Sequence, residues 1–414
     1  MLVLPKKEFF IFILIICFTQ YALPQQALAQ DASTQPASAQ AKYNFFFFKK
    51  GIVDKNKGKY TDAITDFTVF INDYKKQPYA QAYYFRAHCY YYIKDYDKSI
   101  MDFNMHKNLM PNEIDGDMGA GRCYAETGKR EQAVAAFRAA EVLKPESTVV
   151  LNELGLALCH NNDYQNGIVK FQQALKIDSS IAVIYNNLGA ATYFYQDVNR
   201  PLEVDMRKAR ALFTTCLKRD STYLLARRNR AAMHYFLKDY DKAIADLKRC
   251  KQQDRQDATT YFYLSVSYLA KNNWDEAERN LLKVLEINPN SDIAYEELGE
   301  LARLRADYPK AIAAYQKAQS LAPKNELYQG FCDYKMAIVA ATQKDEKAML
   351  TYLRAAKKKN LFTDRDVYNE FMHHAVFQPF MGNLKLQRFI ESLYNIKKTN
   401  KFLSPELRWF KMNR

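Results

Sequence analysis

A repeat of about 34 residues constrains this chain more than any other feature of its sequence. A small residue recurs along the chain, followed four positions later by an aromatic residue or leucine and three positions after that by another mostly small residue. The small residues that begin the pattern in successive repeats are Ala63, Ser99, Ala133, Gly167, Ala209, Ala243, Ala277, Ala311 and Ala348. Most of the steps between them have the same length. Such a period indicates an array of stacked helical or strand units rather than one ordinary domain.

A second small residue lies twelve positions before most of these residues, and a tyrosine or tryptophan often lies three before them. The earlier small residues are Gly51, Ala87, Gly121, Gly155, Ala231, Ser265 and Gly299. Small residues let two helices approach closely, and aromatic side chains fill the space beside them. Only 12 glycines and 12 prolines occur in 414 residues, so the pattern predicts an all-helical chain of helix–turn–helix units.

These spacings, together with prolines that close several units, resemble the tetratricopeptide repeat family. The resemblance covers residues 42–360 as about nine units and implies an all-α, right-handed superhelical solenoid. Unit five departs from the pattern, because Gly189 and Ala209 are farther apart than the two small residues of other units, and we place an insertion near residues 195–209. The period stops near residue 361. Because a repeat array must cover its last apolar face, residues 361–414 are predicted to form a helical C-terminal cap and a basic tail.

The N-terminus is predicted to be a targeting segment. Lys6 and Lys7 precede an apolar run at residues 9–18, and small residues at Ala27 and Ala29 favour cleavage before Gln30. Residues 1–29 are thus predicted to be a signal peptide and residues 30–41 a flexible linker. An uncut membrane anchor is the rival interpretation, although the apolar run has about half of the ~20 residues that a span needs. Lipid attachment at Cys17 is disfavoured, because a large residue precedes it.

The remaining cysteines and the histidines are interpreted as structural. Cys89 and Cys123 lie one full repeat apart, at the same position of neighbouring units. Such positions should be separated by a helix-packing distance of about 8–10 Å, which is too long for a disulfide. The adjacent His373 and His374 lack the spaced partners of a zinc site. We also find no phosphate-binding glycine loop and no serine-nucleophile motif. We therefore expect no catalytic residue, no metal and no cofactor.

The resemblance implies that the first helix of each unit lines a concave groove that holds peptides. The residues predicted to line this groove are Tyr84, His88, Tyr91, Asn152, Asn186, Asn187, Arg228, Asn229, Phe262 and Tyr263. Asparagine side chains can donate a hydrogen bond to an extended peptide backbone and accept one from it, and Arg228 can bind a carboxylate through two hydrogen bonds. Unit eight contributes an acidic stretch at Glu296, Glu297 and Glu300.

Three interpretations of these polar residues stay open. They form a general peptide groove, or a clamp for the carboxylate at a chain end, or a solvated surface without a ligand. The clamp is incomplete, because unit six has Leu225 and Ala232 where the family's clamp has polar groups. Arg230 occupies a position where other units place leucine, and we interpret it as half of an ion pair with a neighbouring unit.

The net charge of +14 is concentrated in two segments. Residues 200–251 carry a net charge of +8 and residues 385–414 carry +6. Five of these residues are predicted to lie on second helices, which form the convex side: Lys218, Arg219, Lys248, Arg249 and Lys251. A basic surface attracts acidic proteins, anionic polymers or nucleic acid. Export and the lack of a base-stacking module argue against nucleic acid.

These observations predict an exported scaffold that holds a protein or peptide partner in the cell envelope or periplasm through its concave groove. The alternative is an accessory subunit of an envelope assembly or secretion complex that docks through the convex basic face. Secretion from the cell and association with the envelope surface are compatible with both functions. No transmembrane span is expected after signal cleavage.

Overall fold

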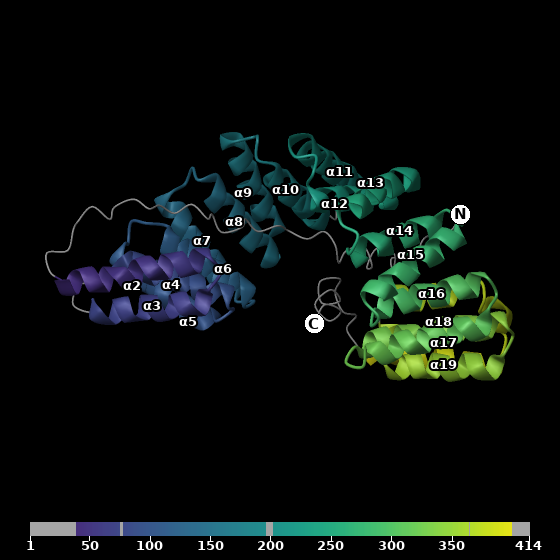
Figure 1. Ribbon diagram of the computed structural model, residues 1–414. Helices are drawn as coiled ribbons and strands as arrows, with labels where there is room; N and C mark the ends of the chain where they lie inside the picture. The colour runs from purple at the N-terminus through teal and green to yellow at the C-terminus, as the bar shows by residue number, and fades with distance from the viewer. Residues whose placement is uncertain (1–38, 75–77, 196–201, 364, 400–414) are drawn as a thin grey trace. The chain divides into compact units, whose positions relative to one another are not determined.

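The computed structural model describes residues 39–74, 78–195, 202–363 and 365–399, and in this part of the chain the fold is entirely helical (Figure 1). Within these ranges, nine first helices alternate with nine second helices. The first helices are α2 (Ala39–Asn56), α4 (Ala80–Tyr92), α6 (Asp115–Glu126), α8 (Thr148–His160), α10 (Ala182–Tyr195), α12 (Leu224–Phe236), α14 (Ala258–Ala270), α16 (Asp292–Leu304) and α18 (Glu326–Thr342). The second helices are α3 (Tyr60–Asp73), α5 (Tyr96–Leu109), α7 (Arg130–Leu143), α9 (Tyr164–Ile177), α11 (Leu202–Arg219), α13 (Tyr240–Gln253), α15 (Trp274–Ile287), α17 (Tyr308–Leu321) and α19 (Glu346–Lys358).

These helix pairs confirm the predicted helix–turn–helix repeat. The second helix of a pair also packs on the first helix of the next pair, for example α3 on α4 and α15 on α16. The described residues divide into two compact units, which we call the N-terminal unit, ending at Asn229, and the C-terminal unit, beginning at Arg230. Each unit is described separately below.

The close approach predicted between small and aromatic residues is present in both units. We number each repeat so that the small residue of its first helix is position 8. A Cβ atom added at Gly155, in the N-terminal unit, would lie 2.7 Å from the Phe171 ring. One added at Gly299, in the C-terminal unit, would lie 2.7 Å from the Tyr315 ring. Both rings are fully buried, so any larger side chain at these two positions would displace a core aromatic.

The turn between the two helices of a repeat has one recurring backbone conformation. Its residue at position 15 has a positive φ in every repeat of the first eight in which that residue is described. These residues are Gly58, Lys94, Gly128, Asn162, Lys238, Asn272 and Ala306. In repeat four the Asp163 N–H donates to the Leu158 carbonyl at 2.8 Å, and the Asn162 N–H donates to the Cys159 carbonyl at 3.0 Å. This pattern satisfies the last carbonyl groups of the first helix.

Several second helices begin with a capping side chain, namely α5, α9, α15, α17 and α19. The side chain of Asp163 accepts a hydrogen bond from the Asn166 N–H, and that of Asn273 accepts one from the Glu276 N–H. A cap of this kind satisfies one of the free N–H groups of the first turn. In these repeats a left-handed residue is thus followed directly by a capping side chain.

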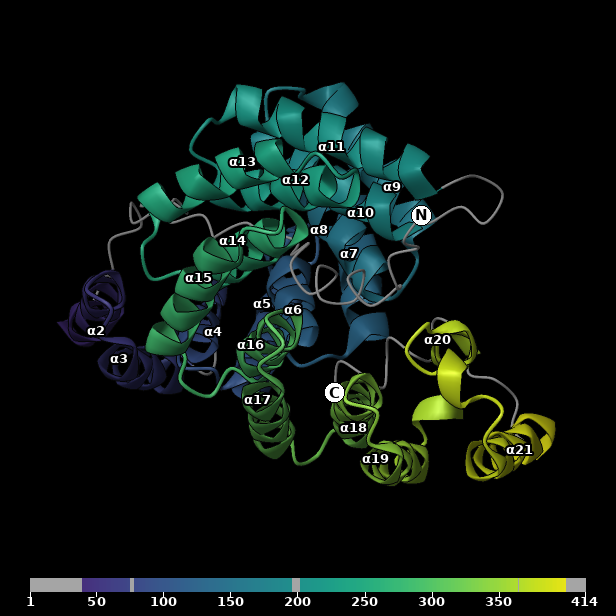
Figure 2. The same cartoon turned by 90° about the vertical axis from the view of Figure 1, so that its right-hand side faces the viewer.

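Beyond α19, the chain folds over the last repeat (Figure 2). The elements there are η1 (Leu361–Thr363), α20 (Arg365–His373), η2 (Gln378–Phe380) and α21 (Leu384–Thr399). Phe371, Phe377 and Phe389 are buried in one cluster with residues of α18 and α19. Asn383 donates a hydrogen bond to Glu346 of α19 at 2.7 Å. This is the arrangement expected of a terminal cap.

Several predictions concern segments at the edges of the described residues. The predicted signal peptide lies outside them, as does the linker up to residue 38, whereas residues 39–41 are already helical in α2. Residues 196–201 of the predicted insertion also lie outside, and residues 202–209 form the start of α11. Among the described helices, none is long and apolar enough to cross a membrane.

The interpretation of the cysteines as buried packing residues is confirmed. The six that the structure describes are all free and buried: Cys89, Cys123, Cys159, Cys216, Cys250 and Cys332. Burial raises the pKa of the Cys89 thiol to about 12 and that of Cys123 to about 11. These thiols therefore stay protonated at neutral pH and are poor nucleophiles.

Candidate functional site

Arg230 forms an ion pair inside its own repeat, so the predicted pairing with a neighbouring unit is wrong. Its Nε and Nη2 atoms donate to the two carboxylate oxygens of Asp246 on α13, at 2.7 and 2.6 Å. The Arg230 side chain is 18% exposed and that of Asp246 is 8% exposed. Two parallel hydrogen bonds between a guanidinium and a carboxylate make a strong and directional contact.

The same contact recurs in two repeats of the N-terminal unit. Arg86 binds Asp102 at 2.7 and 2.8 Å, and Lys50 binds Asp66 at 2.7 and 2.9 Å. In each case a basic residue at position 7 of the repeat meets an aspartate sixteen residues later, at position 23. We call this contact the 7–23 ion pair. It joins the two helices of one repeat.

Repeats with leucine at position 7 have no aspartate at position 23. Repeats four, seven and eight carry Lys170, Asn280 and Ala314 there, and repeat five carries Leu212 at the equivalent place after its insertion. The sequence therefore contained a signal for the role of Arg230, since a basic residue and an aspartate sixteen positions apart occur together. The repeat period alone does not predict this ion pair. The pairing becomes visible only when positions 7 and 23 of the same repeat are compared.

Four predicted groove asparagines form a hydrogen-bonded ladder in the N-terminal unit. Asn229 of α12 donates to the side-chain oxygen of Asn186 at 3.0 Å. Asn186 donates to Asn187 at 3.2 Å, both on α10. Asn187 donates to Asn152 of α8 at 3.0 Å. We call this chain of amides the asparagine ladder. All four side chains are fully buried and join three successive first helices, so the prediction that they line a binding groove stays a prediction.

The two ends of the asparagine ladder are chemically incomplete. The Asn152 Nδ2 atom at one end and the Asn229 Oδ1 atom at the other are buried and have no hydrogen-bond partner among the described residues. A buried amide atom without a partner costs about 1–3 kcal/mol. Both atoms lie inside the fold, so the two ends of the ladder are not accessible from the surface.

Tyr84 and His88 of α4 pack into an aromatic cluster rather than lining an open surface. The His88 ring lies 4.4 Å from the Tyr84 ring and 5.2 Å from the Phe103 ring, measured between centroids. Tyr84 is half-buried and also contacts the ring of His106 at 5.3 Å. Tyr91 is half-buried, and its hydroxyl donates to Glu126 at 3.3 Å. These contacts give the three residues a packing role, and a binding role for them stays a prediction.

His88 is expected to make the stability of the protein sensitive to acid. Burial, with a smaller contribution from Lys55, Arg122 and His106, lowers the pKa of His88 to about 3. The unfolded chain, with an ordinary pKa near 6.5, therefore takes up this proton first. The contribution of neutral, buried His88 to the free energy of unfolding is fully present above pH 6.5. It is lost as the pH falls toward 3, by at most ~1.4 kcal/mol per pH unit.

Urea unfolding at several pH values between 7 and 4 tests this expectation. The variant His88→Gln should show a smaller loss of stability on acidification than the wild type. His373→Gln is the matched control, because His373 is exposed. An unchanged acid slope in His88→Gln would show that other groups carry the effect.

The predicted groove residues on α12 and α14 are also largely covered. Phe262 and Tyr263, on α14 of the C-terminal unit, are each 3% exposed, and their rings lie 5.5 Å apart. Arg228, at the end of the N-terminal unit, is half-buried. Of the predicted groove residues, Tyr84, Tyr91 and Arg228 are therefore the ones that keep accessible surface.

The acidic stretch of α16 is neutralised within the C-terminal unit. Glu300 accepts hydrogen bonds from Arg303 at 2.5 and 3.1 Å and from the Tyr315 hydroxyl at 2.9 Å, and Lys335 binds it at 3.2 Å. Although burial opposes ionisation, these two cations and the hydroxyl hold the pKa of the Glu300 carboxyl well below its usual range. Of the three glutamates in the acidic stretch of unit eight, Glu300 therefore has two cationic partners within the C-terminal unit.

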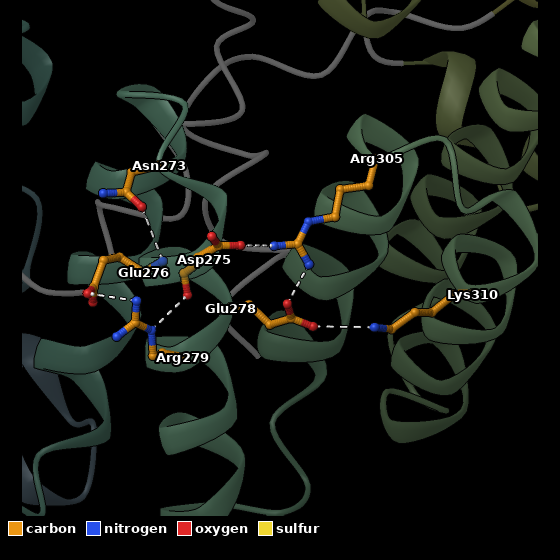
Figure 3. Close-up of polar contacts among 7 residues, drawn as sticks. All are labelled: Asn273, Asp275, Glu276, Glu278, Arg279, Arg305 and Lys310. Carbon is orange, nitrogen blue, oxygen red and sulfur yellow. Dashed lines mark hydrogen bonds and ion pairs between the residues drawn. The ribbon is translucent and has the colours of Figure 1, made fainter.

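A second polar network joins repeats seven and eight (Figure 3). Arg305, at the end of α16, binds Asp275 of α15 at 2.7 Å and also binds Glu278. Lys310 of α17 binds Glu278 at 3.3 Å. Asp275 is 83% exposed, so its contact with Arg305 contributes little. This network connects the second helix of repeat seven to repeat eight through Glu278, which Arg305 and Lys310 both bind.

Comparison with known proteins decides the family. The sequence profile described as tetratricopeptide repeat matches residues 118–180 and 264–326, one segment in each unit. The chain is a tetratricopeptide repeat protein. A solved tetratricopeptide repeat protein from Parabacteroides merdae has a TM-score of 0.51 and 13% identity, over 64% of this chain and 98% of that one. This likeness concerns the fold alone.

Two curated relatives share similar repeats with this tetratricopeptide repeat protein. The anaphase-promoting complex subunit 6 of Arabidopsis thaliana is 23% identical over 54% of this chain and 41% of its own length. The DnaJ homolog subfamily C member 7 homolog of Schizosaccharomyces pombe is 25% identical over 45% and 41%. The chain thus spans about two fifths of each relative. Tetratricopeptide repeats are in general non-enzymatic scaffolds for protein interactions.

Proposed function

We propose that this tetratricopeptide repeat protein is an exported scaffold of the cell envelope that binds an extended peptide segment of a protein partner along its first helices. The observations that support the proposal are the tetratricopeptide repeats themselves and the accessible surface that Tyr84, Tyr91 and Arg228 keep on first helices. The half-buried Arg228, beside Asn229, adds a cation for an acidic side chain of the partner.

Export is supported by the sequence of residues 1–29, with Lys6 and Lys7 before an apolar run and small residues before Gln30. The alternative function, docking in an envelope complex through basic residues of the second helices, is supported by their exposure. Lys218 and Arg219 on α11 are exposed, and so are Lys248, Arg249 and Lys251 on α13.

Crosslinking and affinity capture from the native envelope fraction test the proposal. The wild type is compared with Arg228→Glu, on a first helix, and with the matched charge reversal Arg219→Glu, on a second helix. Capture lost in Arg228→Glu and kept in Arg219→Glu supports peptide binding along the first helices. The reverse result supports the alternative function, and capture unaffected by either change contradicts both. Circular dichroism verifies that each variant is folded.

A further inference from the structure

Two histidines of repeat two lie together inside the N-terminal unit. His88, on α4, is 7% exposed, and His106, on α5, is 3% exposed. Both rings pack against Tyr84, with centroid distances of 4.4 Å for His88 and 5.3 Å for His106. The ring of Phe103 completes the group, 5.2 Å from that of His88. We call these four residues the histidine–tyrosine cluster.

Neither imidazole of the cluster has a hydrogen-bond or ion-pair partner among the described residues. The Nδ1 atom of His106 is buried and unpartnered. Histidines of the C-terminal unit do have such partners, since the Nδ1 atom of His374 accepts from the Val376 N–H at 3.3 Å. A buried imidazole without a carboxylate partner stays neutral, because its charged form would lose hydration and gain no compensating contact.

Cations face His88 from two neighbouring first helices. Burial is the largest cause that lowers the pKa of His88, to about 3, and Lys55 of α2, Arg122 of α6 and His106 add to it. Glu153 of α8 binds Arg122 at 3.1 Å, so it compensates that guanidinium and not the imidazole. A proton on His88 would therefore add a third positive charge to a region that already holds two.

Two carboxylates face His106. Burial lowers the pKa of this imidazole, and Asp115 of α6 and Glu113 oppose that shift. Neither carboxylate forms an ion pair with His106 in the described part of the chain. Tyr84 is the remaining titratable group of the cluster, and burial raises the pKa of its hydroxyl, so it is neutral at pH 7 and below. The cluster is therefore most stable when both imidazoles are neutral.

The cluster lies in one repeat of an array, and an array can open locally because each repeat contacts only its neighbours. The helix α4 packs on α3, and α5 packs on α6. Protonation of the two imidazoles therefore weakens repeat two and these two junctions before it affects distant repeats. Tyr84 is also half-buried on a first helix and belongs to the accessible surface on which the proposed function depends.

We propose that the histidine–tyrosine cluster is an acid-operated switch of partner binding. At neutral pH the two uncharged imidazoles hold Tyr84 in place on the first-helix surface, and in acid their protonation opens repeat two and releases the partner. The release rests on the proposed function, whereas the opening of repeat two does not. Histidine is the side chain that changes its charge in the range over which such switches work, and an exported chain meets the pH of its surroundings.

Hydrogen exchange of the protein purified from its own cells, followed by mass spectrometry at pH 7.5 and pH 5, tests the opening. Labelling times are scaled to the intrinsic exchange rate at each pH. With an ordinary pKa near 6.5 in the open state, each imidazole favours opening by up to about thirtyfold at pH 5. We therefore expect protection in α4 and α5 to fall at least about tenfold relative to α14 and α15, which contain no histidine.

The double variant His88→Gln/His106→Gln should lose this pH dependence. The control His373→Gln, at an exposed position of α20, should retain it. Equal loss of protection in α4 and α14 would overturn the switch, and so would an unchanged pH dependence in the double variant. Where circular dichroism shows that the double variant does not fold, NMR titration of the wild type decides, since pKa values at or above 6.5 for both imidazoles would overturn the switch.

Affinity capture from the native envelope fraction tests the release. Partner proteins captured at pH 7.5 should elute at pH 5 from the wild type and stay bound to His88→Gln/His106→Gln. A partner that the wild type retains at pH 5 would overturn the release even where repeat two opens. Absence of capture at pH 7.5 would contradict the proposed function instead, and the exchange experiment would still decide whether repeat two opens.

Discussion

Replacing Arg230 alone by methionine is expected to lower the free energy of unfolding by about 3 kcal/mol. The change leaves Asp246, which is 8% exposed, without the guanidinium that binds both of its oxygens. Unpaired buried carboxylates are costly because desolvation is no longer offset by attraction. Urea unfolding of wild type and variant at neutral pH measures the difference.

The double variant Arg230→Leu/Asp246→Ala separates loss of the pair from loss of packing. It recreates the leucine and alanine that repeat eight carries at positions 7 and 23, Leu298 and Ala314. We expect its stability to lie within about 1 kcal/mol of the wild type, since apolar replacement of an ion pair is often neutral. Lys242→Met is the control, because Lys242 is 66% exposed in its pair with Asp239. A double variant as unstable as the single one would contradict the role of the 7–23 ion pair.

Replacing Asn187 by alanine is expected to cost about 2–4 kcal/mol of folding stability. It removes the donor to Asn152 and the acceptor for Asn186, so both neighbours keep a buried amide atom without a partner. Thermal or urea unfolding followed by circular dichroism measures the loss. Asn104→Ala on α5 is the control, because Asn104 is exposed. Equal stabilities of the two variants would show that the asparagine ladder contributes nothing.

The expected instability of Asn187→Ala also affects how the peptide site is tested. A ladder variant that fails to bind a partner can fail because three first helices have lost their connection. Arg228 avoids this ambiguity, since it is half-buried and belongs to no hydrogen bond of the ladder. The asparagines are therefore tested for stability and Arg228 for binding.

The repeat could be predicted from the sequence because it depends on short-range spacing. Gly155 and Phe171 lie sixteen residues apart on paired helices, and their contact recurs in each repeat that has the same residue types. The burial of Asn187 could not be predicted in this way. Whether a polar residue of a first helix faces solvent or a neighbouring amide depends on the side chain that the next repeat brings against it. The family pattern predicts on which side of the first helix a residue lies. It does not predict which side chain of the next repeat contacts that residue.

The exposure of Phe46 is a second feature that the repeat pattern does not predict. Phe46 is 57% exposed, whereas the residue five positions before the small residue of the first helix is buried in repeats two to eight, for example Ala82. The difference arises because no preceding repeat lies against α2 among the described residues, so an end of the array has properties that no repeat reveals alone.

The left-handed residue at position 15 has a consequence for how such an array can change. Gly58, Lys94, Asn162 and Ala306 adopt nearly the same φ, which lies between 58° and 75° wherever position 15 is described in the first eight repeats. Because four different residue types support one backbone shape, the bend between helices does not depend on the side chain at its centre. The turns of different repeats are therefore expected to be interchangeable. Copying the turn of one repeat into another should leave helix pairing intact, and replacing Lys94 by glycine should relieve local backbone strain.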